Sequence, residues 1–79
     1  MPKAQADAVA RDRTAALEAV ERIAATPDHE AFDALLTLSA VVGEALGRSA
    51  RLLAETTSWA AVGDASGTTR QAAWARWHG

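Results

Sequence analysis

Apolar residues recur at helical spacing along the first third of the chain. Between about Ala4 and Ala25 they lie three, seven, four and three residues apart, which places them on one face of an α-helix. Leu17 and Ala24 widen this face. Because the face is rich in alanine and therefore thin, we expect it to pack closely against another helix rather than to stand alone in water. Its residues are Ala6, Val9, Ala16, Val20 and Ile23.

The next segment predicts a second, longer helix that begins at Thr26-Pro27-Asp28. Thr26 is placed to cap the helix, Pro27 suits the first helical position, and acidic residues in the first turn favour the positive end of the helix dipole. The apolar face of this helix stays in phase to about Glu55 or Thr56. That face comprises Phe32, Leu35, Leu36, Val42, Leu46, Ala50 and Leu53.

Two glycines, Gly43 and Gly47, interrupt the second helix four residues apart. Each costs about 1 kcal/mol relative to alanine in a helix. They either allow another helix to approach closely or mark a kink that divides the segment. The sequence leaves both interpretations open.

The last third of the chain predicts two short helices joined by a turn. Ser58 is placed to cap a helix from Trp59 to Ala65, after the pattern breaks at Thr56-Thr57. Ser66-Gly67-Thr68 forms the turn, and Thr69 can cap a final helix from Arg70 to about Trp77. No strand is expected, so the predicted fold class is all-α with about four helices.

The length of 79 residues allows one domain with a small core. We expect residues 1–79 to form a single helical domain, in which 1–56 serve assembly and 57–79 carry the two short helices. A core of this size supplies only about 3 to 5 kcal/mol, and no disulfide is available. Self-association would bury more apolar surface and add stability. The chain is therefore predicted to form a homodimer through its first two helices, including Val9, Val20, Ile23 and Leu46.

Several function classes receive no support from the composition. Without cysteine there is no thiolate catalysis and no cysteine metal site, which suits a reducing, cytoplasmic setting. His29 and His78 lie far apart with no companion at metal-ligand spacing, so no metal is expected. No catalytic arrangement, phosphate loop or other sign of a cofactor or small-molecule ligand is visible. No run approaches the roughly 20 apolar residues that span a bilayer, so no membrane association is expected.

Charge is distributed unevenly although the whole chain carries only −2. Residues 1–47 hold four basic and eight acidic residues, giving −4, whereas residues 48–79 hold four arginines against Glu55 and Asp64, giving +2. This asymmetry fits a chain with one end that faces nucleic acid and another that faces solvent or a partner.

The segment Ser58–Trp77, SWAAVGDASGTTRQAAWARW, resembles the helix-turn-helix of small bacterial and phage DNA-binding regulators. That family has a small residue where Gly63 falls, so that the two helices can cross, and a turn glycine where Gly67 falls. Val62 and Ala73 occupy positions that are usually apolar in the family.

The segment also departs from the family pattern at three positions. Ser66, Thr68 and Arg76 stand where apolar residues are usual, which leaves thinner core support. Trp74 and Trp77 offer apolar area in compensation. We expect these two tryptophans and Trp59 to belong to the core rather than to stack on bases.

The resemblance implies that the helix Arg70–Trp77 reads the major groove of double-stranded DNA. By helical projection Ala73 and Trp77 point inward, with Arg70 and Trp74 at the flanks. Gln71 can then pair with adenine and Arg70 with guanine, while Ser58, Thr69 and Arg76 suit phosphates. The expected DNA-binding residues are Ser58, Thr68, Thr69, Arg70, Gln71, Ala72, Ala75 and Arg76.

Arg48 and Arg51, three residues apart, form either a further phosphate-contacting edge or an ordinary solvated face. The function expected from these observations is that of a small dimeric transcriptional regulator, most simply a repressor. A helical protein-interaction module of antitoxin or adaptor type is the alternative from another class. A third interpretation keeps DNA binding in a phage packaging or partition adaptor. A positive face centred on Gln71 and Arg76 favours DNA.

Overall fold

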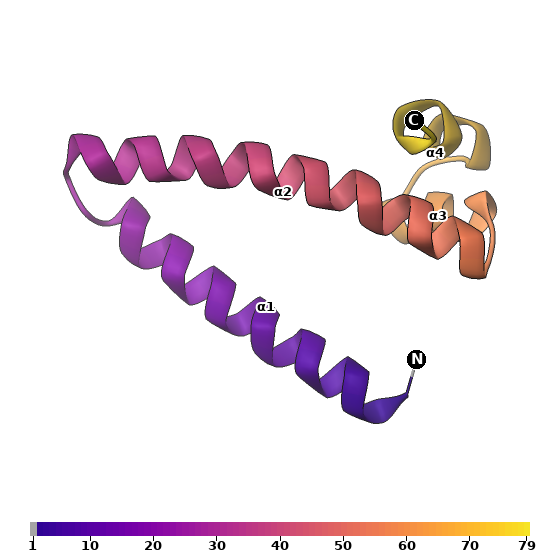
Figure 1. Cartoon of the computed structure of the whole chain (residues 1–79), viewed down its shortest axis with the longest axis horizontal. Coiled ribbons are helices and arrows are strands. Elements are labelled where there is room, and N and C mark those ends of the chain that lie inside the picture. The colour runs from indigo at the N-terminus through magenta and orange to yellow at the C-terminus, as the bar shows by residue number, and fades with distance from the viewer. Residues whose placement is uncertain (1) are drawn as a thin grey trace. The chain divides into compact units, whose positions relative to one another are not determined.

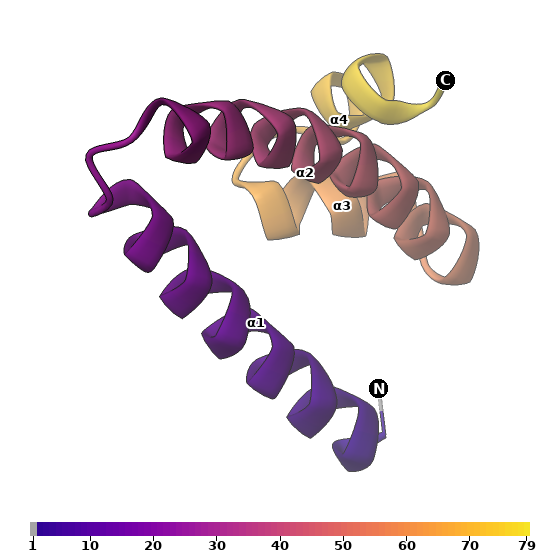
Figure 2. The same ribbon diagram turned by 60° about the vertical axis from the view of Figure 1, so that its left-hand side comes forward.

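The computed structural model describes residues 2–79 and consists of four α-helices (Figure 1). Two longer helices, α1 (Lys3–Ala24) and α2 (His29–Thr56), are followed by two short ones, α3 (Trp59–Ser66) and α4 (Arg70–Trp77). The short helices contact each other, and a second view shows the same pair (Figure 2). The all-α prediction is therefore confirmed, and its element order is correct.

The chain divides into two compact units. The N-terminal unit, Met1–Leu38, holds α1 and the first part of α2, and the C-terminal unit, Ser39–Gly79, holds the rest of α2 with α3 and α4. The boundary falls inside α2, which nevertheless runs as one unbroken helix. The segment that resembles a helix-turn-helix, Ser58–Trp77, lies entirely in the C-terminal unit.

The predicted start of α2 is wrong by two to three residues, because the helix begins at His29. The hydroxyl of Thr26 donates to the carbonyl of Arg22 at 2.9 Å, so it satisfies the end of α1 instead of capping α2. Threonine hydroxyls readily make this bond to the carbonyl four residues back. Asp28 caps the start of α2 instead, because its Oδ1 accepts a hydrogen bond from the amide of Glu30 at 3.2 Å.

The two glycines of α2 differ in their surroundings. Gly47 is buried, and a Cβ placed there would lie 3.9 Å from Cδ1 of Trp77 and 3.3 Å from Nη1 of Arg51. Gly43 has no neighbour within 4 Å of such an atom. Gly47 thus lies beside Trp77 and Arg51 whereas Gly43 faces open space, and neither glycine divides the helix.

The core of the C-terminal unit is small and contributed by three helices. Ala50 of α2, Val62 of α3 and Ala73 of α4 are buried together, and Ala73 has no exposed surface. Ala54, Trp59 and Trp77 pack against this cluster. A core this narrow lets three short helical segments approach closely, but it provides little burial energy.

The expectation that all three tryptophans belong to the core is wrong for Trp74, which is 48% exposed. Ala73 occupies the closest approach of α4 to the core, and the next residue points well away from it. The Trp74 ring stacks instead on the ring of His78, with centroids 3.8 Å apart and planes 6° from parallel. His78 Nδ1 also lies 2.6 Å from the carbonyl oxygen of Trp74.

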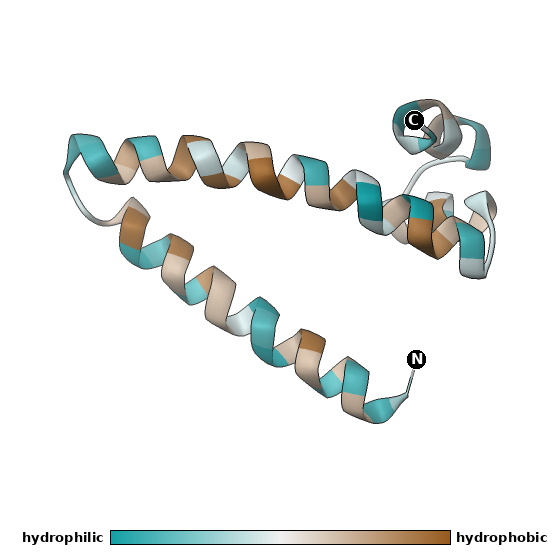
Figure 3. Ribbon diagram, in the orientation of Figure 1, coloured by the Kyte–Doolittle hydropathy of each residue, from teal (hydrophilic) through white to brown (hydrophobic). Residues whose placement is uncertain are grey.

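Many large apolar side chains of the longer helices are exposed, and Figure 3 shows how apolar residues are distributed along these helices. No residue of α1 is buried, and Val9 is 56% exposed. Within the N-terminal unit, the close helix packing expected for this face is therefore not found. Exposed apolar residues also occur on α2 in each unit: Phe32 and Leu36 in the first, and Val42, Leu46 and Leu53 in the second. Across residues 2–79, none of the helices combines the length and apolarity needed to cross a membrane.

Candidate nucleic-acid interface

Helix α3 begins at the predicted cap. Ser58 is extended, and its Oγ accepts a hydrogen bond from the amide of Ala61 at 3.0 Å. The helix continues one residue beyond the prediction, to Ser66. The Ser66 hydroxyl donates to the carbonyl of Val62 at 2.7 Å, which explains how a polar residue fits where an apolar one is usual: its polar group is satisfied within its own helix.

The turn after α3 depends on Gly67. Its backbone is left-handed, with φ of 73° and ψ of 29°, a conformation that glycine adopts without steric cost. The next amide, that of Thr68, donates back to the carbonyl of Gly63 at 2.8 Å. This bond across six residues is typical of glycine-terminated helices and satisfies a carbonyl that the helix end would leave unpaired.

Gly63 lies directly against the backbone that leads into α4. A Cβ at this position would be 2.8 Å from the carbonyl carbon of Thr69 and 2.9 Å from the carbonyl oxygens of Thr68 and Thr69. No real side chain tolerates such distances to backbone atoms, so only glycine permits this approach. The closest contact is with the start of α4 rather than with its middle.

Helix α4 begins at the second predicted cap. Thr69 is extended, and its Oγ1 accepts from the amide of Ala72 at 3.1 Å. This cap orients α4 so that Ala73 enters the core. The two capping residues, Ser58 and Thr69, are exposed at the surface. Thr68, in the turn before α4, is exposed as well.

The structure leaves the predicted outward face of α4 open to solvent. Arg70, Gln71, Ala72, Ala75 and Arg76 are all exposed. The guanidinium carbon of Arg76 lies 5.0 Å from the centre of the adjacent Trp77 ring, within range of a cation–π contact. The residues expected to touch DNA on α4 are thus presented together on one short helix.

The end of α4 is held by Arg51, for which two roles remained open from the sequence pattern. Nη1 of Arg51 donates to the carbonyl oxygen of Trp77 at 3.0 Å, joining α2 to the last turn of α4. A cation suits this place because helix carboxyl ends carry partial negative charge. The two residues are 26 positions apart, so no local sequence pattern could have indicated the bond.

The arginines of the C-terminal unit have no acidic partner. Within residues 2–79, one basic and one acidic side chain lie within 4.0 Å of each other. They are His29 and Asp33, with 3.7 Å between Nε2 and Oδ2. Arg48, Arg51, Arg70 and Arg76 therefore keep uncompensated charge. Over the same residues, no three histidine, aspartate or glutamate side chains gather closely enough to hold a metal ion.

No known protein family, characterised protein or solved structure matches the chain. The likeness to helix-turn-helix regulators therefore rests on the residues between Ser58 and Trp77 and on the local geometry just described.

Replacing Gly63 with alanine should destabilise the C-terminal unit by about 1 to 3 kcal/mol, because the new methyl group would overlap backbone atoms that cannot move independently. The matched control is Gly43→Ala, which places the same methyl group in open space and should stabilise α2 by up to about 1 kcal/mol. Urea denaturation followed by tryptophan fluorescence measures both, since all three tryptophans lie in this unit. Equal shifts for the two variants would contradict the close contact at Gly63.

Proposed function

We propose that this chain binds double-stranded DNA sequence-specifically as a small dimeric transcriptional regulator, most simply a repressor, and that α4 enters the major groove. The observation that carries the proposal is the backbone contact between Gly63 and Thr68–Thr69, together with the left-handed Gly67. These features fix two short helices around a glycine turn, and this supports the proposal because a helix-turn-helix needs such a turn.

The exposed face of α4 is chemically suited to a groove. Ala72 and Ala75 are short, so the helix backbone can sit deep, and their methyl groups can touch thymine methyls. The side-chain amide of Gln71 could pair with adenine by donating through its nitrogen and accepting through its oxygen, and the guanidinium of Arg70 could pair with guanine. These contacts would supply sequence discrimination.

The capping residues are suited to the phosphates beside the groove. The oxygens of Ser58 and Thr69 each accept one backbone amide, which leaves each hydroxyl proton free to be donated to a phosphate oxygen. Thr68 is exposed in the turn between them, and Arg76 adds a charge near the other end of α4. Such contacts would set register without reading sequence.

The dimer is proposed to form through the apolar faces of α1 and α2. The three buried core residues, Ala50, Val62 and Ala73, provide little burial energy, whereas many larger apolar side chains are exposed. Burying them against a second copy would recover the missing stabilisation. The same faces also suit the alternative of a protein-interaction module, whose partner would be another protein.

DNA binding can be tested with duplexes selected from a random library, followed by fluorescence anisotropy. Gln71→Ala should relax the preference at one base pair by about 1 to 3 kcal/mol. Arg76→Ala should weaken binding to all sequences similarly and flatten the salt slope by about one unit. Equal losses on selected and random duplexes for both variants would contradict the assignment of contacts, and no enrichment of any duplex would contradict the function.

The dimer can be tested by sedimentation equilibrium at tens of micromolar. We expect about twice the chain mass of 8.3 kDa, and we expect Val20→Glu to shift the protein to the monomer by placing a charge in the interface. Ala4→Glu is the matched control, because Ala4 is exposed and helical projection places it about 160° around α1 from Val20, so the same charge there should leave the dimer intact. A monomeric wild type would remove the expectation of a palindromic operator with half-sites about 34 to 36 Å apart.

A further inference from the structure

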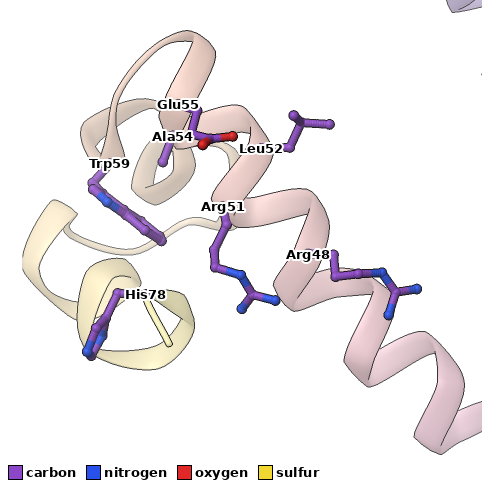
Figure 4. Close-up of a pocket in the computed structure, with 7 residues that line it drawn as sticks. All are labelled: Arg48, Arg51, Leu52, Ala54, Glu55, Trp59 and His78. Atoms are coloured by element: carbon purple, nitrogen blue, oxygen red, sulfur yellow. The ribbon is translucent and has the colours of Figure 1, made fainter.

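Three arginines of the C-terminal unit surround one open depression beside the end of α4. Arg48 and Arg51 reach it from α2 and Arg76 from α4, and Glu44 lies at its edge. A second depression borders the same two α2 arginines and extends to Glu55 and His78 (Figure 4). Figure 4 shows Arg48 and Arg51 extending from α2, with Arg51 nearer to α4. Positive charge is therefore gathered where α2 meets the last turn of α4.

This cluster has no internal counter-charge at close range. No carboxylate of residues 2–79 lies within 4.0 Å of any of the three guanidinium groups. The bond from Arg51 to the Trp77 carbonyl satisfies one donor but leaves the positive charge in place. Three positive charges against the single carboxylate of Glu44 leave an excess of positive charge around the depression, and this excess favours an anion there.

We propose that Arg48 and Arg76 contact phosphates of the DNA strand that borders the groove entered by α4, while Arg51 positions the end of that helix. The inference rests on the proposed function. Arg76 belongs to α4 itself, so an anion held by the cluster lies next to the groove-reading face, where a duplex places its backbone. Guanidinium groups also bind phosphate oxygens through two parallel hydrogen bonds.

The three arginines are given different roles because they differ in burial and in hydrogen bonding. Arg51 is half-buried and bonded to Trp77, whereas Arg48 and Arg76 are exposed and bonded to no carboxylate. Arg48 is the informative position, since it lies outside α4 and outside the helix-turn-helix segment. Its contribution to DNA binding is not implied by the motif and can be measured separately.

The experiment compares Arg48→Gln with wild type on a fluorescein-labelled mixed-sequence duplex of about 30 base pairs over a range of salt concentrations. Losing one phosphate contact should reduce the slope of log affinity against log salt by about one unit and weaken binding about five- to tenfold near 0.1 M salt. Arg11→Gln on α1 removes the same charge elsewhere and should leave the slope unchanged. Glu44→Gln removes the acidic group beside the cluster and should leave binding equal or tighter. Circular dichroism checks that each variant is helical.

The outcomes separate this inference from the function on which it rests. If wild type binds the duplex and Arg48→Gln keeps the wild-type slope, the phosphate contact is refuted while the proposed function stands. If Arg11→Gln and Arg48→Gln weaken binding equally, the effect comes from net charge and the inference is again refuted. If wild type binds no duplex, the proposed function and the inference both fail.

Discussion

The arrangement of the C-terminal unit depends on the contact between Gly63 and the backbone of Thr68 and Thr69. With no side chain at Gly63, the backbone of Thr68 and Thr69 lies so close to α3 that a Cβ at Gly63 would be less than 3.0 Å from it. This approach lets Ala50, Val62 and Ala73 meet in a core built from small residues. The Gly67 turn and the Thr69 cap then fix the direction of α4, and the bond from Arg51 holds its other end.

Features set by neighbouring residues could be predicted from the sequence. Ser58 and Thr69 cap their helices, and Gly67 is left-handed, because each depends on atoms only a few residues away. The start of α2 was mispredicted because Thr26 had two local options and its hydroxyl bonds backward to Arg22. Helix phase correctly placed Ala73 inward but did not reveal that the core is too narrow to cover Trp74.

Features that join distant segments could not be predicted. The Arg51–Trp77 bond links residues 26 positions apart, and the place of Gly47 beside Trp77 depends on the same packing. The gathering of Arg76 with Arg48 and Arg51 follows from that packing, because Arg76 stands far from the other two in the sequence. The exposed apolar faces of α1 and α2 were visible as patterns, but their lack of cover within the chain appears only in the structure. The arginine cluster is the basis for the proposed phosphate contacts, and the exposed apolar residues of α1 and α2 are the basis for the proposed dimer.

In the proposed function, α4 is the element that contacts DNA. This contact can be tested by titrating ¹⁵N-labelled protein with a duplex selected from a random library and following the amide signals by nuclear magnetic resonance. If α4 enters the groove, the largest shifts should fall on the amides of residues 69–76, with smaller ones at the start of α3. Shifts confined to α1, or no shifts at saturating duplex, would contradict it.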